Sequence, residues 1–510
     1  MSIIYDLKQH RQANLIYQES IDRLTPDRIM KFIRHHHDYQ QPRLQMLDDY
    51  YQGFNTNILE ADNRRTDTEK ADHRAVHSFG KYIADFQTSF SVGNSITVKH
   101  DEDERLDEIE NSNDFDSVNS ELFLDTTRFG RAFEYIYRGG DDMEHSVVFS
   151  PLETFVIYSL AVDPKPIMAV RYHLIELVGD NNQATYQYRV ETWTSEQYTL
   201  YKPTYLDGVM SVEEQMPLYA FPVIEYKNNQ FRIGDFENVV PLIDLYDAAQ
   251  SDTANYMTDL NDAMLVIKGD IDTLLQNPNM MSGIDPSDEN AAKQMAQDKL
   301  DMLKSMKQAN MLLLKSGVSV TGQQTNVDAQ YIHKEYDVTG TESYKERLAH
   351  DIHKFSHTPD LTDENFAGNA SGVAMKYKVL GTIELASTKR KAFEVGLHKR
   401  YQIIQQLETL SAGGMKVNAN DLKFSFTDNM PADDVATVAQ IVSAGAQVPQ
   451  EYLYQYLPNV QDPSEITEQL ETERTNQVQQ ARAANGLQTD AELSANGERQ
   501  ARYAKEHEAS

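Results

Sequence analysis

The spacing of apolar residues predicts that the chain begins with helices. Thr25-Pro26-Asp27 supplies an N-cap, a first-turn proline and an early acid, so a helix should run from there toward Tyr39. A second helix is predicted from Pro42 to Gln52, because apolar residues recur there at helical spacing and Gly53 follows. A third helix is predicted from Glu69 to Phe90.

Further along, the period changes to that of strands. The stretches Phe133–Tyr137 and Val147–Phe149 flank a turn at Gly139–Asp142, which predicts a β-hairpin. Tyr186–Thr192 alternates with a period of two, and Tyr198–Tyr201 is expected to continue the same sheet. The N-terminal half is therefore predicted to be an α+β domain.

The middle of the chain predicts two long helices around a small insert. The first stretch, Val239–Lys268, has no glycine and places Pro241 where a helix begins. Its apolar residues recur at helical spacing, at Leu242, Leu245, Tyr246, Ala249, Tyr256, Leu260 and Met264. A short strand at Met264–Gly269 and a loop rich in Asn, Pro, Gly and Asp should follow. The second helix is expected over Asn290–Ala309, and another strand over Met311–Leu314.

The region after residue 357 predicts a loop joined to an unusually long helix. Thr358–Gly372 has the composition of a loop, and the 38 residues Val373–Leu410 would form a rod of about 57 Å. One side of that helix would be apolar, at Val379, Leu380, Ile383, Ala386, Phe393, Leu397, Tyr401, Ile404 and Leu407. Gly381 and Gly396 are candidate bend points, so the pair is interpreted as a mobile loop on a bendable lever.

Cations are concentrated on this long helix, and they are expected to meet phosphates or the acids of another subunit. They are Lys376, Lys378, Lys389, Arg390, Lys391, Lys399 and Arg400. The chain as a whole is acidic, with 47 Lys and Arg against 79 Asp and Glu and a formal net charge of −32. Tight DNA binding is disfavoured, because affinity follows the number of phosphates that cations neutralise. An acidic wall would still let DNA slide, and an acidic surface also favours solubility.

Other features of the composition narrow the class of protein. The absence of cysteine excludes disulfides, thiolate zinc sites and cysteine nucleophiles. Because the start does not resemble a signal peptide and no run of about 18 apolar residues occurs, we expect a cytoplasmic protein. No phosphate loop, dinucleotide-binding fingerprint or nucleophile elbow is present, so we predict neither an enzyme nor a cofactor.

Three groups of residues raise the question of a metal site, and each is interpreted otherwise. Asp101-Glu102-Asp103-Glu104 lacks the glycine and spacing of a calcium loop, so it should be a solvated loop or helix face. A helix predicted over Glu342–Ser356 would place three histidines on one face: His350, His353 and His357. Their spacing is not that of a zinc hydrolase, which favours a structural or surface role. His35-His36-His37 diverges around a helix and is interpreted as a solvated face.

Several segments, read in order, carry a resemblance to a known family: Tyr50-Tyr51-Gln52-Gly53, Val223–Asn229, Gly234–Val239, Leu242–Asp247, Asp363–Phe366 and Gly368–Met375. The chain resembles the portal proteins of tailed bacteriophages, and most closely the portal family of siphophages that infect Gram-positive hosts. The resemblance covers roughly residues 25 to 460 in collinear order. The most specific motif of this resemblance is Gly-Asn-x-Ser-Gly, which directly precedes the long helix.

The resemblance implies a helix-rich α+β portal fold with wing, stem, clip and crown. Its parts would be 1–235 (N-terminal region and wing), 236–263 (stem helix), 264–289 (clip), 290–309 (second stem helix), 310–357 (return to the wing), 358–371 (tunnel loop), 372–412 (long bent helix), 413–430 (wing strand) and 431–510 (crown and C-terminal tail).

The resemblance also implies which residues act. In the tunnel loop, the residues that face the channel would be Asp360, Thr362, Asp363, Glu364, Asn365, Phe366 and Asn369. On the helix behind it, the basic residues would be Lys376, Lys378, Lys389, Arg390 and Lys391. In the clip, the residues that dock partners would be Lys268, Asp270, Asp272, Asn277, Asn279 and Asp285.

The function implied by the resemblance is a ring of about twelve subunits at one capsid vertex, through which DNA is packaged and ejected. Its partners would be further copies of the chain, double-stranded DNA without sequence preference, the large terminase, head-completion or adaptor proteins, scaffolding protein and major capsid protein, with no membrane. The ring would be part of the virion and would assemble in the host cytoplasm. Twelve copies would carry about −380, so ring closure should depend on salt. The alternatives are another head–tail or baseplate adaptor of a phage, and a metal-dependent hydrolase.

Overall fold

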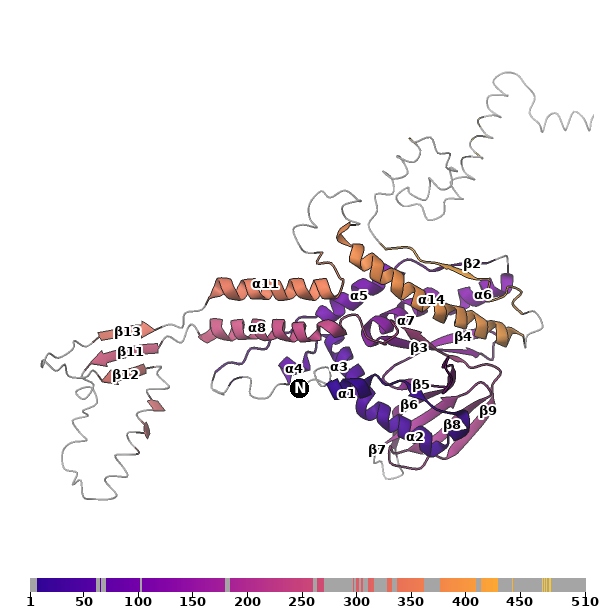
Figure 1. Cartoon of the computed structure of the whole chain (residues 1–510), viewed down its shortest axis with the longest axis horizontal. Coiled ribbons are helices and arrows are strands. Elements are labelled where there is room, and N and C mark those ends of the chain that lie inside the picture. The colour runs from indigo at the N-terminus through magenta and orange to yellow at the C-terminus, as the bar shows by residue number, and fades with distance from the viewer. Residues whose placement is uncertain are drawn as a thin grey trace, which may run out of the picture. The chain divides into compact units, whose positions relative to one another are not determined.

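The computed structural model describes residues 7–60, 65, 70–100, 103–178, 184–259, 264–269, 297, 300–301, 304–305, 311–315, 328–332, 337–361, 377–409, 414–429, 443, 470, 472, 474 and 477. The chain divides into two units, Met1–Asn429 and Met430–Ser510. The elements described below belong to the first unit (Figure 1).

A six-stranded sheet forms one part of the α+β domain. Its strands, in spatial order, are β1 (Tyr17–Gln18), β5 (Thr154–Tyr158), β6 (Pro166–Val178), β7 (Ala184–Trp193), β8 (Gln197–Thr204) and β9 (Val212–Pro217). Neighbouring strands are antiparallel, except that β1 runs parallel to β5. The two strands predicted from the alternation are β7 and β8, so that prediction is confirmed.

A second sheet contains the predicted hairpin. It has the order β10 (Val223–Lys227), β3 (Arg131–Arg138) and β4 (Glu144–Phe149), all antiparallel. Aromatic side chains of the two sheets pack together: Phe149 lies against Trp193 of β7, with ring centroids 5.5 Å apart. This packing joins both sheets in one apolar core.

Most helices of the first unit pack beside these sheets, whereas α8 and α11 lie side by side and extend away from them (Figure 1). They are α1 (Leu7–Ala13), α2 (Pro26–His35), α3 (Gln41–Gln52), α4 (Thr56–Leu59), α5 (Phe79–Val92), α6 (Glu104–Asn113), α7 (Phe115–Phe129), α8 (Val240–Asp259), α11 (Val338–Phe355) and α14 (Leu380–Glu408). Short helical turns occur at Ile21–Arg23, His36–Gln40 and Glu237–Val239. Two predicted helix ends are confirmed, because the Thr25 hydroxyl accepts from the Arg28 N–H and Gly53 is left-handed with a φ of 86°.

Two polar groups that were interpreted as solvated are in fact buried. His36 is fully enclosed, its Nδ1 lies 2.7 Å from the Tyr172 hydroxyl, and burial lowers the pKa of its imidazole. Asp103 caps α6 and accepts the backbone N–H groups of Lys416 (2.6 Å) and Val417 (2.9 Å). The interpretation is wrong for these two residues, because their side chains bind partners that lie far away in the sequence. Glu104 is exposed at the start of α6, and Asp101 and Glu102 lie outside the described residues.

The third predicted helix is shorter than expected. It begins at Phe79 instead of Glu69, because the described residues from Ala71 to Ser78 run extended beside α8. Three backbone N–H groups of this segment donate to α8 side chains four residues apart: His73 to Asn255 (2.7 Å), Ala75 to Ser251 (2.9 Å) and His77 to Asp247 (3.0 Å). A helix there would have lost these three bonds.

The same contacts decide which face of α8 is buried. Asp247, Ser251 and Asn255 are buried along it, whereas Leu245 of the predicted apolar stripe is 49% exposed. The described part of this helix covers Val240–Asp259, and Met264 begins the strand predicted to follow it.

A small sheet lies between α8 and α11 along the chain (Figure 1). Its order is β12 (Met311–Lys315), β11 (Met264–Gly269) and β13 (Asp328–Ile332). The strands predicted for β11 and β12 are confirmed, and β13 was not predicted. The helix that packs along α8 is α11, with the Lys345 ammonium donating to the Gln250 side chain at 3.1 Å.

The long helix α14 lies on β10, β3 and α5. Much of its predicted apolar side is buried, at Val379, Ala386, Phe393, Leu397, Tyr401 and Ile404. The helix itself begins at Leu380, after a turn at Val379, so it is shorter than the predicted Val373–Leu410. Residues 373–376 and 410 of that prediction lie outside the described part of the chain. A strand in the 413–430 region, β14 (Lys423–Ser425), pairs with β2 (Thr97–Lys99). Of the helices described, none is long and apolar enough to cross a bilayer.

Candidate functional site

Of the predicted loop 358–371, the structure describes Thr358–Leu361, and we call this segment the loop root. Helix α11 ends at Phe355, and His357 beyond it adopts a left-handed φ of 54°. His357 therefore does not share a helix face with His350 and His353, contrary to the prediction. The described residues contain no group of three or more His, Asp or Glu side chains placed to hold a metal ion.

Side chains from two helices hold this loop root. The Tyr82 hydroxyl of α5 donates to the Pro359 carbonyl at 2.8 Å and accepts the Leu361 N–H at 3.3 Å. A second α5 residue, the buried Gln87, donates to the Thr358 hydroxyl at 3.1 Å. From α14, the buried Thr382 hydroxyl donates to the His357 carbonyl at 2.6 Å. The entry of the loop is thus tied both to α5 and to the helix that follows the loop.

Among the predicted channel-facing residues, only Asp360 is described. Its side chain is 41% exposed, and its carboxylate lies 3.9 Å from Nε2 of His353. The other predicted loop residues lie outside the described part of the chain: Thr362, Asp363, Glu364, Asn365, Phe366 and Asn369.

Two of the predicted basic residues of α14 contact acids of their own chain. Lys389 is buried in an ion pair with Asp235, and burial lowers the pKa of its ammonium while Asp235 opposes that shift. Arg390 donates to the Asp428 carboxylate at 2.5 Å and to the Ser91 carbonyl at 2.9 Å. The expectation that these two would meet phosphates or another subunit is wrong. Lys378 and Lys391 are exposed, and Lys376 is not described.

Arg400, counted among the same cations, is fully buried. Its Nε lies 2.7 Å from the Glu134 carboxylate of β3, which also accepts the Tyr226 hydroxyl at 2.6 Å. The Tyr226 ring rests on Gly396, where an added Cβ would come within 2.2 Å of a ring carbon. Gly396 is therefore explained by close packing, and α14 continues through it.

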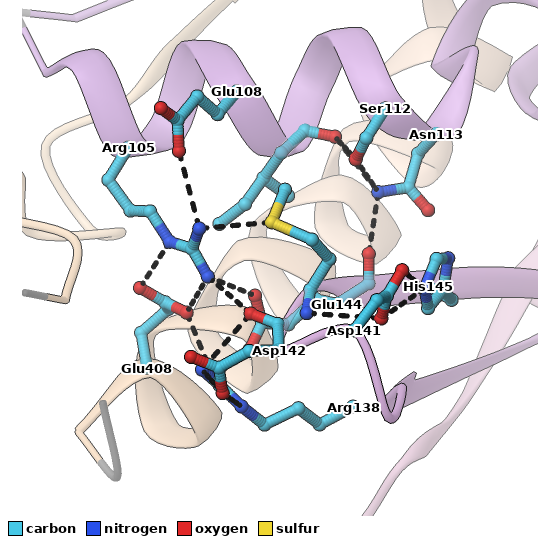
Figure 2. A network of polar contacts seen from close by, with 12 residues as sticks. Arg105, Glu108, Ser112, Asn113, Arg138, Asp141, Asp142, Glu144, His145 and Glu408 are labelled. Carbon is cyan, nitrogen blue, oxygen red and sulfur yellow. Dashed lines mark hydrogen bonds and ion pairs between the residues drawn. The ribbon is translucent and has the colours of Figure 1, made fainter. Parts of the chain in front are cut away.

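The last residue of α14, Glu408, enters a polar network with α6 and the β3–β4 hairpin (Figure 2). Arg105 of α6 donates to Glu408 from Nε and Nη2, both at 3.0 Å, and Arg138 of β3 donates to it at 2.9 Å. Arg138 also pairs with Glu144 of β4. The helix behind the loop is thus fixed to the α+β domain by ion pairs along its length.

Comparison with known proteins identifies the family. The family model "Phage portal protein, SPP1 Gp6-like" matches residues 30–480. The chain belongs to this family of phage portal proteins. It is also 21% identical over 481 residues to the portal protein of Bacillus phage SPP1. The aligned region covers 89% of this chain and 85% of that protein. The expected resemblance to siphophage portals of Gram-positive hosts is confirmed.

Two solved structures are similar to the chain. They are titled as the neck of an empty GTA particle computed with C6 symmetry and the neck of a native GTA particle computed with C12 symmetry. The first has a TM-score of 0.37 at 11% identity and covers 81% of this chain and 90% of the other. The second has a TM-score of 0.35 at 12% identity and covers 80% and 90%.

Membership of the portal family decides the class of function. Portal proteins are structural components of phage particles and form oligomeric rings, so the chain is a portal component and not an enzyme. The portal fold predicted from the sequence, helix-rich α+β, is confirmed.

Most residues predicted to dock partners are not described. Lys268 lies in β11, where its backbone pairs with Leu314 and Asp328. The remaining ones lie outside the described residues: Asp270, Asp272, Asn277, Asn279 and Asp285. The contacts that hold the loop root were not anticipated, because Tyr82 and Pro359 are 277 positions apart in the sequence.

Proposed function

We propose that the chain forms a closed ring of about twelve subunits at one vertex of the capsid. The ring surrounds a channel through which double-stranded DNA enters during packaging and leaves during ejection. The observation that carries this proposal is the match of the portal family model to residues 30–480. Assembly takes place in the host cytoplasm, before packaging.

The pair α8 and α11 acts as the stem, and the segment between them acts as the clip. This proposal shifts the boundaries expected from the sequence, 264–289 for the clip and 290–309 for the second stem helix. The reason is that β12 and β13 both pair with β11, and that α11 is the helix packed along α8. The clip then extends over residues 264–332 and docks the large terminase and later the head-completion proteins.

The loop after Thr358 faces the channel and touches DNA without holding it. The anchoring of its root by Tyr82, Gln87 and Thr382 supports this role, since a fixed root sets where a loop can reach. The net charge of −32 also supports it, because acidic walls give the DNA backbone few sites to bind. Lys391 of α14 is exposed, and we assign it a contact with phosphates or with a neighbour's acids.

Further partners of the ring are the scaffolding protein and the major capsid protein, which surround it at the vertex. Residues 431–510 supply the crown and the C-terminal tail.

Labelling of particles tests this function against a head–tail or baseplate adaptor. The full chain would carry a C-terminal peptide tag during infection, and gold-labelled antibody would be located on opened particles by electron microscopy. Label at one vertex per capsid is expected. Label at the distal end of the tail, or at every vertex, would contradict the proposal.

A further inference from the structure

The end of α14 is held by two buried carboxylates that share two arginines (Figure 2). Glu408 closes α14 and Glu144 begins β4, and both carboxylates are only 1% exposed. Arg138 contacts Glu144 and lies 2.9 Å from Glu408, while Arg105 makes two 3.0 Å contacts with Glu408 and lies 3.9 Å from Glu144. Four separate elements therefore meet at this pair.

The two arginines would balance the two carboxylates only if they contacted no other acid. Each arginine also serves an exposed acid: Arg105 contacts Glu108 at 3.3 Å, and Arg138 contacts Asp142 at 2.6 Å. The other charged groups nearby are already paired, since Asp141 contacts His145 at 2.9 Å and Asp103 binds the backbone at Lys416. Two cations thus face four acids, two of which are buried.

One oxygen of Glu144 marks where a proton would sit. Its Oε2 is buried and accepts no hydrogen bond from the residues that the structure describes. A charged oxygen without a donor is costly in such a place, whereas a protonated one can donate to the neighbouring carboxylate. Burial, followed by the hydrogen bond and charge of Glu408, raises the pKa of Glu144 to about 7. Burial alone would raise the pKa of Glu408, but its hydrogen bonds with Arg105, Glu144 and Arg138 outweigh burial and lower that pKa to about 2.

We propose that Glu144 and Glu408 share one proton and form a proton-linked latch that holds the end of α14 on α6 and the β3–β4 hairpin. With the proton in place, the pair carries one negative charge between two arginines. Without it, two buried negative charges repel each other, and the end of α14 is held less tightly.

The direction of the pH dependence follows from the two pKa values. When the latch opens, Glu144 returns toward its usual pKa of 4.5, so the closed state holds one more proton than the open state between pH 4.5 and about 7. Rising pH therefore favours opening within that window, and the effect levels off above about 7. The lowered pKa of Glu408 stabilises the closed state above pH 4.5, and this stabilisation is lost as the pH falls from 4.5 toward about 2.

Hydrogen–deuterium exchange at the end of α14, in the full chain, tests the latch. After correction for the intrinsic exchange rate, the opening constant should rise about tenfold per pH unit below neutrality and then stay constant. The Glu144→Gln variant cannot lose a proton and keeps a donor toward Glu408, so its opening constant should not change over this window. Glu108→Gln removes only an exposed partner of Arg105 and should keep the wild-type profile.

A flat wild-type profile would overturn the proposal, and so would a Glu144→Gln profile with the wild-type slope. If Glu144→Gln does not fold, Glu408→Gln provides the same test. It removes the hydrogen bond and charge that add to burial in raising the pKa of Glu144, and it leaves both arginines to that one carboxylate, so the upper end of the sloping window should move to lower pH. An unchanged window in the folded Glu408→Gln variant would show that Glu144 is not coupled to Glu408 and would overturn the proposal.

Discussion

Three cations of α14 attach this helix to acids that lie far from it in the sequence. Lys389 pairs with Asp235, Arg390 with Asp428, and Arg400 with Glu134. The lysine and Arg400 are buried, so removing either would leave a buried carboxylate without its counter-ion. These pairs position the helix whose Thr382 hydroxyl holds the loop root.

Replacing Lys389 with methionine should destabilise the fold by about 3–5 kcal/mol, because Asp235 would remain buried without its counter-ion. The matched control is Lys391→Met on the same helix, which is exposed and should change stability by less than about 0.5 kcal/mol. Denaturant unfolding of both variants measures the difference. Equal stabilities would show that the Lys389 pair contributes nothing.

Gly396→Ala should also destabilise the protein, by about 1–3 kcal/mol, because the new Cβ would collide with the Tyr226 ring. Gly381→Ala is the control in the same helix, where the nearest atom to a new Cβ is a His357 ring nitrogen at 3.3 Å. That change should be neutral or stabilising, since alanine favours helix. Thermal unfolding checks both, and a stable Gly396→Ala variant would refute the packing role.

The sequence alone could not show which cations of α14 are buried in ion pairs and which are exposed. Lys389 and Lys391 look alike on a basic stretch, and only the fold brings Asp235, 154 positions away, against one of them. The buried Asp103 and His36 were missed for the same reason. By contrast, the Thr25 cap and Gly53 were predicted correctly, because their partners lie within one helical turn.

At the scale of elements, local patterns predicted the hairpin β3–β4 and the strands β7 and β8, where alternation and turn residues decide the structure. The start of α5 was predicted wrongly. Residues before Phe79 have no strand pattern and no helix breaker, and they are extended only because α8 offers them Asp247, Ser251 and Asn255 as acceptors.

The loop root gives a prediction at this scale. Deleting Asp363–Asn369 should leave rings intact, because Thr358 and Pro359 keep their bonds to Gln87 and Tyr82. DNA packaging should be blocked, since the segment proposed to face the channel is gone. Electron microscopy would report ring formation, and nuclease-protected DNA would report packaging.

A second variant keeps the loop length but replaces Asp363–Asn369 with glycine and serine. It distinguishes an effect of loop length from an effect of the side chains. If the deleted chain fails to assemble, the loop belongs to the structural core and not to the channel surface.

For the whole molecule, the net charge of −32 per subunit makes ring assembly sensitive to ions. A ring of about twelve subunits concentrates this charge, and screening by salt or divalent cations lowers the repulsion. The fraction of rings in sedimentation velocity should therefore rise with ionic strength. Unchanged rings from low to molar salt would contradict this expectation.

At this scale the sequence was informative because the family resemblance spans most of the chain, and the match at residues 30–480 confirms it. It was less informative about the boundaries of the clip. The pairing of β11 with β12 and β13 joins segments separated by long stretches, which no local pattern predicts.

The central claim is that copies of this chain close into a ring around a channel. Cryo-electron microscopy of the purified full-length protein tests it most directly. The account predicts closed rings of about twelve subunits with Thr358–Leu361 at the wall of the central hole. Monomers, open filaments, or rings with the loop root on the outer surface would contradict it.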